Sequence, residues 1–325
     1  MVEQQATRRN FMRMVSRRSR LMLEIASELV AARDWAHPQI RLTMRDQGAE
    51  SWGPTFFASD SPDSIHEVAK GTVQLAIVNP GSILNMALKG TGPFRDPVPV
   101  RAITILGQHD QLVLGVSADT GLTSLEDIRD KRYPLKVSLR GQMDHSVHLV
   151  VDEMLKAAGF SLDDIKSWGG EVRYDNGLPS NNPNRIGAVE RGEITAIFDE
   201  AAGWRHQALK IGMRIIPIGE ETLSKLEALG LQRGIITKES TPGLPEDVPT
   251  IDFSGWIIYV RDDMPDDEVW AICAALEARK DRIPPGTGEP PLPLDRMCKD
   301  TPEGRLPIPL HPAAERFWRE QGYLS

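Results

Sequence analysis

The fold is decided by residues 64–82, which read SIHEVAKGTVQLAIVNPGS. Residues 64–70 are predicted to form a short helix that stops at Gly71, because glycine commonly ends a helix in the left-handed conformation. The almost wholly apolar run 73–78 predicts a strand buried on both faces, as strands of parallel sheets are. The segment 79–82 then breaks the strand and leads into another helix. This alternation is typical of an α/β fold with mainly parallel sheets.

The same alternation extends in both directions along the chain. Towards the N-terminus, the sequence predicts an amphipathic helix over 19–34 and a strand over 40–44. Towards the C-terminus, strands over 98–106 and 111–116 are expected to complete a first lobe.

A second unit is predicted to begin at Ser124, which starts a helix in a capping-box-like pattern. A strand over 135–140 follows, and Gly141 turns it into a helix that ends at Gly159. Residues 171–184 are predicted to be a polar loop. The remaining expected elements are a helix at 185–191, a strand at 195–198, further elements at 214–218, 221–229 and 234–237, a strand at 251–260, helices at 265–280 and 312–321, and an extended proline-rich connection at 283–294.

Composition narrows the class of protein. The chain has 325 residues, of which 40% are apolar and 26% charged, which suits two globular domains and excludes wholesale disorder. No apolar run is long enough for a transmembrane helix. The net charge of −8 gives no overall positive field, so nucleic acid is not an expected partner.

The N-terminal segment is basic. Residues 1–20 carry six arginines against Glu3, and 7–13 are similar to a twin-arginine export motif. Such a motif needs an apolar stretch and a cleavage site after it, whereas residues 16–20 read SRRSR. We therefore expect no working export signal in the chain as given, and a cytoplasmic location. The alternative is that the true start lies upstream.

Enzyme motifs are missing from the sequence. It has no Walker A loop, nucleophile elbow, His-Glu-x-x-His or Cys-x-x-Cys. Its two cysteines, Cys273 and Cys298, are too few for a disulfide framework or a four-cysteine zinc site, and Cys273 is expected to pack in the core.

Four segments resemble the TAXI family, the extracytoplasmic solute-binding proteins of tripartite ATP-independent periplasmic (TRAP) transporters. Their order and spacing carry the resemblance, which covers about residues 21–323. The segments are 64–78 (SIHEVAKGTVQLAIV), 125–132 (LEDIRDKR), 191–198 (RGEITAIF) and 309–318 (PLHPAAERFW).

The resemblance implies a two-lobed type II periplasmic-binding-protein-like fold with two hinge crossings. One lobe would comprise 1–115 plus 252–325, and the other 116–251. It further implies a small-molecule ligand between the lobes, membrane transporter subunits as partners, and a periplasmic location if the start is incomplete. This chain departs from the family at residues 10–20, where a strand and a Gly-rich loop are usual, and at 141–146, where GQMDHS replaces a Gly-Ser-Gly-like loop.

Several side chains are candidates for ligand binding because they stand at strand ends or helix starts, where exposed N–H groups favour anions. In the segment that follows the strand at 135–140, backbone N–H groups could hold a carboxylate, with Arg140 or His145 adding charge-assisted bonds. The alternative is that Asp144 merely caps the helix. The candidates are Trp52, Asn79, Ser82, Arg140, Gln142, Met143, Asp144, His145, Asp199, Glu200 and Trp204.

Three of these candidates have alternatives of their own. Asn79 could shape a turn instead of contacting a polar ligand. Trp52 could bury its own loop instead of closing over a flat ligand. Asp199 could cap a helix while Glu200 is exposed to solvent, instead of both facing an amine or a metal.

A second function remains open from the sequence. His145, His148, Asp199 and Glu200 offer nitrogen and oxygen ligands suited to a divalent metal ion. With such a cofactor, the protein could be a cytoplasmic decarboxylase or lyase acting on a small, possibly aromatic, carboxylic acid, with His145 or Glu200 moving a proton. The alternative for His148 is a packed, neutral side chain. The leading prediction is solute binding with no cofactor; a cytoplasmic ligand sensor is a third reading.

Overall fold

The structure is a computed structural model that describes residues 40–43, 55–58, 61–106, 110–200, 202–279 and 308–324. All of them belong to the compact unit formed by residues 40–325. The helix predicted at 19–34, the proline-rich connection at 283–294 and Trp52 lie outside the described residues.

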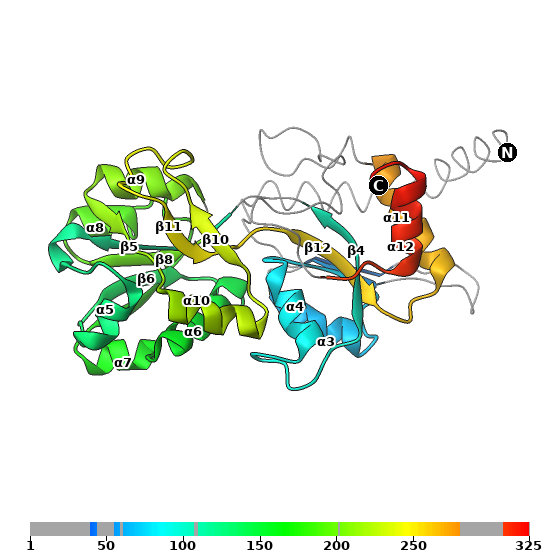
Figure 1. Ribbon diagram of the computed structural model, residues 1–325, viewed down its shortest axis with the longest axis horizontal. Coiled ribbons are helices and arrows are strands. Elements are labelled where there is room, and N and C mark those ends of the chain that lie inside the picture. The colour runs from blue at the N-terminus through cyan, green and yellow to red at the C-terminus, as the bar shows by residue number, and fades with distance from the viewer. Residues whose placement is uncertain are drawn as a thin grey trace. The chain divides into compact units, whose positions relative to one another are not determined.

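The first sheet has five strands in the order β1-β2-β3-β12-β4 (Figure 1). The strands are β1 (Ile40–Thr43), β2 (Thr55–Ala58), β3 (Leu75–Val78), β12 (Trp256–Arg261) and β4 (Val100–Leu106). β2 and β3 are parallel, and β12 runs antiparallel to both of its neighbours. The helices α3 (Ser64–Ala69) and α4 (Ser82–Lys89) flank β3 in sequence as predicted, and Gly71 follows α3 with φ +74°.

The second sheet has five strands in the order β7-β6-β8-β5-β9. They are β7 (Glu171–Asp175), β6 (Lys136–Arg140), β8 (Ala196–Asp199), β5 (Val113–Ser117) and β9 (Met213–Ile215). β6 is parallel to β7 and β8, whereas β5 is antiparallel to β8 and β9. The ends of β6 and β8 therefore meet at one edge of this sheet.

Two predictions about these strands were wrong. The strand expected at 111–116 to complete the first lobe is β5 (Val113–Ser117), and it pairs within the second sheet. The predicted loop 171–184 begins with β7, which pairs with β6 over five residues. β7 is an edge strand with no fully buried residue, so its sequence lacks the apolar run that signals a central strand.

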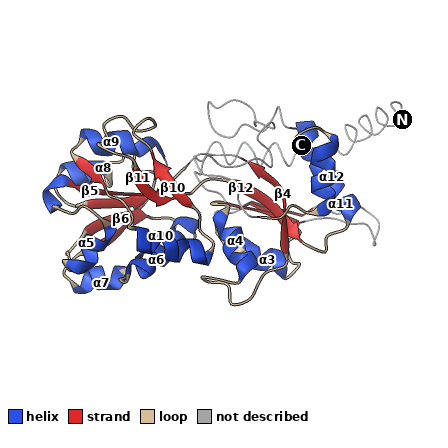
Figure 2. Cartoon of the chain, viewed as in Figure 1, coloured by secondary structure: helices blue, strands red, loops and turns tan. Residues whose placement is uncertain are grey.

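Helices cover the second sheet, and Figure 2 shows them against its strands. They are α5 (Leu125–Asp130), α6 (Ser146–Ala158), α7 (Leu162–Ser167), α8 (Ile186–Glu190), the 3-10 turns at 118–120 and 202–204, α9 (Arg205–Lys210) and α10 (Glu220–Leu229). Ser124 caps α5 by accepting the N–H of Asp127, and Gly159 ends α6 with φ +88°, both as predicted. A two-stranded sheet of β10 (Arg233–Ile236) and β11 (Val248–Ile251), together with α11 (Asp266–Arg279) and α12 (Pro312–Glu320), completes the described elements.

The chain crosses between the two five-stranded sheets twice, after β4 and before β12. The crossings are hydrogen-bonded to each other: the N–H of Leu112 donates to Ile251, and the N–H of Phe253 donates to Asp110 at 2.8 Å. Two five-stranded sheets, each with its own helices, are joined by two crossings. This arrangement confirms the predicted fold class, a type II periplasmic-binding-protein-like fold.

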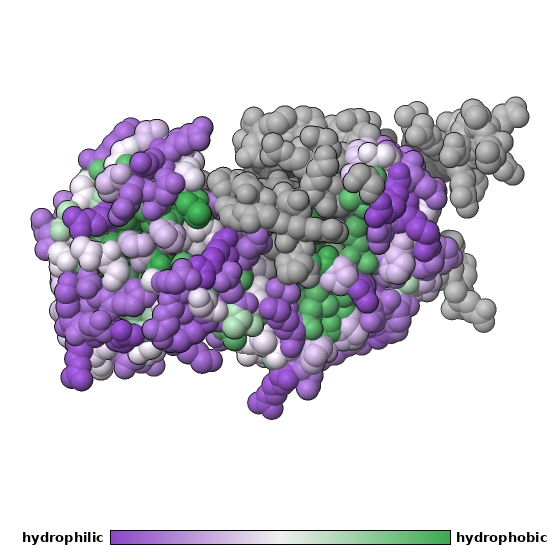
Figure 3. All heavy atoms as spheres, viewed as in Figure 1, coloured by the Kyte–Doolittle hydropathy of each residue, from purple (hydrophilic) through white to green (hydrophobic). Residues whose placement is uncertain are grey.

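Packing follows the predicted apolar segments. The largest buried cluster includes Val78, Leu84, Leu139 and Val150, and Cys273 lies in a second cluster with Trp318, as expected. Hydrophilic side chains predominate on the described surface shown in Figure 3. Among the described helices, none combines the length and apolar character that spanning a bilayer requires.

Candidate functional site

A buried ion cluster lies where β6 and β8 end. Arg140 ends β6 and Asp199 ends β8, and these parallel strands are direct neighbours. Arg140 Nε and Nη2 donate to Asp199 Oδ1 at 3.1 and 2.8 Å. The residues that end these two strands are therefore in direct contact within one sheet.

A second arginine completes the pairing of Asp199. Arg185, which has no exposed surface, pairs through Nη1 with the other oxygen of Asp199, and its Nε donates to Ser138 Oγ at 3.1 Å. The Asp199 carboxylate therefore bridges two buried guanidinium groups, and the alternative in which Asp199 caps a helix was wrong. Such a bridge locks the ends of β6, β8 and the start of α8 together.

Glu200 lies beside this bridge and shares Arg140 with it. Its side chain is 12% exposed, so the predicted solvent exposure was wrong, and its Oε1 accepts from Arg140 Nη2. Burial raises the pKa of Glu200 well above its usual value, and Asp110 and Asp199 act in the same direction against the pull of Arg140.

His145 starts α6 and joins the same cluster. Its Nδ1 accepts the N–H of Val147 at 3.1 Å, so His145 is the cap, and the alternative that Asp144 caps this helix was wrong. The ring is 6% exposed. Its Nε2 lies 2.9 Å from Arg140 Nη1 and 3.9 Å from Glu200 Oε1, and its face stacks on Phe253.

The loop that brings His145 to this place depends on Gly141. A Cβ at Gly141 would lie 2.5 Å from Asn176 Oδ1 and 2.9 Å from the backbone of the loop after β7. Only glycine lets the two loops approach so closely. Beyond it, Gln142 is half-buried, Met143 is 61% exposed and Asp144 is exposed.

The residues predicted as metal ligands are not assembled as a metal centre. His148 Nε2 lies 3.0 Å from the carbonyl oxygen of Gln142, and its ring packs against Tyr174. The Asp199 carboxylate forms ion pairs with two arginines, Arg140 and Arg185. Over the described part of the chain, no group of three or more His, Cys, Asp or Glu side chains is placed to hold a metal ion.

Two predicted residues come from the first sheet. The Asn79 amide donates to the carbonyl of Phe253 at 3.1 Å, and the Asn79 carbonyl accepts from Ser146 Oγ at 2.5 Å. Ser82, at the start of α4, is 1% exposed, and its hydroxyl has no hydrogen-bond partner among the described residues. A buried hydroxyl without a partner costs free energy, which a ligand acceptor would offset.

These contacts join end to end and form what we call the contact ring. Phe253 links back to it through its ring, which stacks on His145. The members of the ring are Asn79, Arg140, His145, Ser146, Glu200 and Phe253. The ring brings the start of α4 and the start of α6 to the same place.

Trp204 does not belong to this site. Its ring has no exposed surface and packs against the backbone of β5, where a Cβ at Gly115 would lie 3.2 Å from it. It is a core residue, and a ligand has no access to its face.

Sequence reasoning missed Asp110, Arg185 and Phe253. Each stands outside any motif: Asp110 and Phe253 lie on the crossings, and Arg185 follows the polar loop 176–184. One signal was available, because an arginine directly before the apolar start of a helix is costly to bury unless a carboxylate meets it. Which carboxylate meets it depends on strand order, which the local sequence does not carry.

Comparison with known proteins extends this description. The alkanesulfonate-binding protein SsuA from Xanthomonas axonopodis pv. citri bound to MOPS is 12% identical, with a TM-score of 0.29 over 67% of this chain and 62% of that chain. The periplasmic aliphatic sulphonate binding protein SsuA from Escherichia coli is also 12% identical, with a TM-score of 0.34 over 67% and 56%. The chain thus covers less than two thirds of the length of either protein, and likenesses this weak carry no conclusion about a ligand.

A family match is more extensive. Residues 58–322 match the NMT1-like family, and this range includes every described residue of the contact ring. The match spans well over half of the sequence, and the chain belongs to the NMT1-like family.

Proposed function

We propose that this protein binds a small anionic organic solute, without covalent chemistry, where α4 and α6 begin. Membership of the NMT1-like family supports a solute-binding function for a small ligand. The observation that carries the anionic class is the 2.5 Å hydrogen bond from Ser146 Oγ to the carbonyl of Asn79, because it holds the starts of the two helices together.

Two helix N-termini at one place favour an anion. The first N–H groups of a helix have no partner within the helix, and the helix dipole adds about half a positive charge at that end. α6 is 13 residues long and α4 is eight. The hydroxyl of Ser82 adds a buried donor without a partner among the described residues. A carboxylate, phosphate or sulfonate group would accept from these donors.

The arginines serve this site indirectly. Arg140 Nε, Nη1 and Nη2 already contact Asp199, His145 and Glu200. We therefore assign Arg140 to positioning His145 and Glu200 rather than to direct contact with the solute. Direct contact falls to the Ser82 hydroxyl, whose donor is not used by a described residue, and to N–H groups at the two helix starts, while Ser146 and Asn79 hold those starts together.

The solute would enter by parting the contact ring. Two surface depressions lie elsewhere in the described chain, between α6 and α7 and beside α8 and α9, and neither holds a ring residue. The two crossings give the chain a place to hinge, and closure around a ligand at such a hinge is a common mode of binding. As the resemblance to TAXI proteins implies, we further propose membrane subunits of a TRAP transporter as the partner.

The direct test is calorimetric titration with matched pairs of acids and amides. The probes are acetate, benzoate, succinate and L-alanine, each beside acetamide, benzamide, succinamide or L-alaninamide. We expect at least one acid to bind and its amide to bind at least about tenfold more weakly, since a bond to a charged group contributes about 1.5–3 kcal/mol. Binding by none of the acids would overturn the proposal.

A pair of serine variants locates the site. Ser146→Ala removes the hydrogen bond between the two helix starts, whereas Ser167→Ala removes a 2.7 Å bond from an exposed hydroxyl to the Asp164 carbonyl within α7. We expect the first to weaken binding of the acid about tenfold and the second to leave it unchanged. Equal affinities in both variants would place the solute elsewhere.

A further inference from the structure

We propose that α4 and the end of α10 form a latch that holds the two five-stranded sheets together and slows the release of a bound solute. The latch lies apart from the solute site. Its effect on release rests on the proposed function, whereas its effect on opening does not. The latch consists of Asn85, Lys89 and Thr91 on one side and Glu227, Leu229 and Gly230 on the other.

The two sides of the latch belong to different sheets. α4 directly follows β3 of the first sheet. α10 is fixed to helices of the second sheet, because Thr222 Oγ1 donates to Glu126 Oε1 of α5 at 2.7 Å and Lys225 Nζ donates to the Ala157 carbonyl of α6 at 3.2 Å. Figure 1 shows α4 and α10 next to each other, and the bonds between them link the two sheets at a place other than the crossings.

The bonds of the latch run from side chains near α4 to the last carbonyls of α10. Asn85, which is 7% exposed, donates through Nδ2 to the Gly230 carbonyl at 2.8 Å. Thr91 Oγ1 donates to the Leu229 carbonyl. The last carbonyls of a helix have no partner within the helix, and its dipole places about half a negative charge there. Side-chain donors from the other sheet therefore satisfy acceptors that α10 cannot satisfy itself.

The backbones of the two helices also fit closely. A Cβ at Gly230 would lie 3.0 Å from the backbone nitrogen of Met86 and 3.2 Å from the carbonyl carbon of Asn85. Gly230 ends α10 with φ +112°, a conformation that other residues adopt only with strain. Met86 and Leu226 of α10 lie in the same buried cluster. The latch thus combines hydrogen bonds with a close approach of two backbones.

The spacing of residues along α4 couples the latch to the solute site. Ser82, Asn85 and Lys89 stand at i, i+3 and i+7, which places them on one face of the helix. That face begins at the solute site with Ser82 and continues into the latch with Asn85. A helix moves as a rigid element, so a motion that parts the start of α4 from Ser146 also draws Asn85 away from Gly230. Opening of the solute site therefore breaks the latch.

The latch acts without touching the solute. None of its residues belongs to the contact ring, and none is assigned a contact with the anion. The closed form is stabilised by the latch whether or not solute is bound, and a bound solute leaves only after the latch has broken. Loss of the latch should therefore raise the open fraction and speed release, while the groups that hold the anion stay the same.

Two threonines in the same local setting provide the variant and its control. Thr91 and Thr72 each follow a glycine that ends a helix, and each donates to the carbonyl five residues back, at 3.3 and 3.0 Å. Thr91 in addition reaches Leu229 on α10, whereas the further contact of Thr72 stays within its own helix. The variants are Thr91→Val, Thr91→Val combined with Asn85→Leu, and the control Thr72→Val. Thermal unfolding of each shows whether it is folded.

The first measurement follows opening with no solute present. Double electron–electron resonance reports the distance between spin labels at two exposed positions, Lys70 beside α3 and Lys166 on α7, in a protein whose native cysteines are replaced by alanine. We expect the ratio of the longer to the shorter distance population to rise about fivefold in Thr91→Val and about tenfold or more in the double variant. Thr72→Val should match the wild type. Wild-type distances in both latch variants would overturn the latch.

The second measurement follows release of the solute. The tightest acid among acetate, benzoate, succinate and L-alanine is bound in radiolabelled form and chased with an excess of the unlabelled acid. We expect release to be faster by the same factors in the two latch variants and unchanged in Thr72→Val.

The outcomes separate this inference from the proposed function. Longer distances with no acid bound by any variant would support the latch and overturn the function. Acid binding with release unchanged in both latch variants would support the function and overturn the control of release by the latch.

Discussion

Two histidines start helices in this protein by the same contact, and their surroundings differ. His145 starts α6 and His311 starts α12. In each, Nδ1 accepts the N–H two residues further on, at 3.1 and 3.2 Å. Both rings are buried, with 6% and 2% of their surface exposed. The difference between the two sites lies in what the other ring nitrogen meets.

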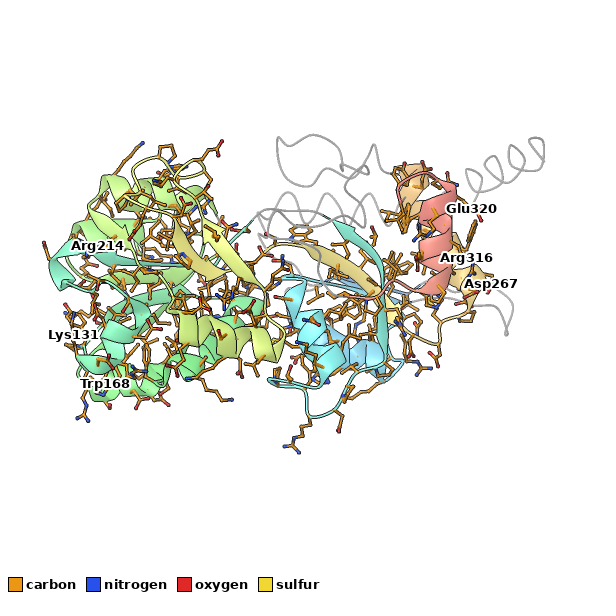
Figure 4. All side chains as sticks on the ribbon, viewed as in Figure 1. Lys131, Trp168, Arg214, Asp267, Arg316 and Glu320 are labelled. Carbon is orange, nitrogen blue, oxygen red and sulfur yellow. The ribbon has the colours of Figure 1, made fainter. Side chains whose placement is uncertain are left out.

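At His311, the second nitrogen meets a neutral acceptor. Nε2 lies 3.1 Å from the carbonyl oxygen of Met264, and the nearest acid, Asp266, is exposed and 4.0 Å from Nδ1. Asp266 is paired instead with Arg316, labelled on α12 in Figure 4. The ring therefore joins two segments of chain and does nothing that requires charge.

At His145, the second nitrogen meets charged groups held away from water. Nε2 faces Arg140, which is shared with Asp199 and Glu200. The comparison teaches that the same capping contact of a histidine can be purely structural, as in α12, or can place the ring in a cluster of charged groups, as in α6. The position of the helix in the fold decides which. α6 begins beside the ends of parallel strands, where ligands collect, and α12 does not.

The largest expected effect is a difference in the free energy of unfolding between variants of two acids, Asp199 near His145 and Asp266 near His311. Asp199→Asn leaves two buried guanidinium groups without their carboxylate, and should lower the free energy of unfolding by about 3–5 kcal/mol. Asp266→Asn removes an exposed pair and should cost less than about 1 kcal/mol. Urea denaturation of both variants checks this, and similar losses would contradict the buried role of Asp199.

A smaller effect should come from the caps themselves. His311→Ala removes the acceptor for Ala313 and should lower the free energy of unfolding by about 1–2 kcal/mol, whereas His311→Asn should retain most of it, since Asn caps helices well. His145→Ala should show a similar loss and, in addition, weaker binding of the acid. Unchanged affinity in His145→Ala would mean that both histidines are structural.

The smallest effect is on pH dependence, and its sign should differ between the two regions. Burial lowers the pKa of His311, so its contribution to stability is present above the pKa of the unfolded chain and is lost as the pH falls through the lowered value. Burial raises the pKa of Glu200, so its contribution is lost as the pH rises through the raised value.

Urea denaturation at pH 5, 7 and 9 measures both signs. His311→Asn should lose less stability than the wild type between pH 7 and pH 5. Glu200→Gln should lose less than the wild type as the pH rises from 5 to 9. A pH response of Glu200→Gln that matches the wild type from pH 5 to pH 9 would show that Glu200 does not titrate in this range.

The sequence predicts the parts of this structure that depend on local chemistry. Gly71 and Gly159 end helices, and Ser124 starts one, because single residues decide those contacts. The predicted strand ends at Arg140 and Asp199 are also correct, and this position is what makes both residues candidates for ligand binding. Local chemistry does not decide between two neighbouring residues that can both accept a helix N–H. Asp144 and His145 are such a pair, and the cap of α6 is His145.

The sequence does not predict what depends on strand order. β7 pairs with β6 through its backbone at the edge of the sheet, so its sequence does not show the apolar run of a central strand. The bridge from Asp199 to Arg140 and Arg185 needs β6 and β8 as neighbours, and the stacking of His145 on Phe253 needs the crossing beside them. These are contacts between residues far apart in sequence, and no local pattern specifies them.

The most direct test of the central claim is the affinity of the bound acid for Ser82→Ala beside Thr104→Val. Both substitutions delete a buried hydroxyl that has no hydrogen-bond partner among the described residues, but Ser82 starts α4 whereas Thr104 lies within β4. We predict that neither substitution lowers the free energy of unfolding, and that Ser82→Ala weakens binding about tenfold or more while Thr104→Val leaves binding unchanged. Wild-type affinity in Ser82→Ala would contradict an anion site where α4 and α6 begin.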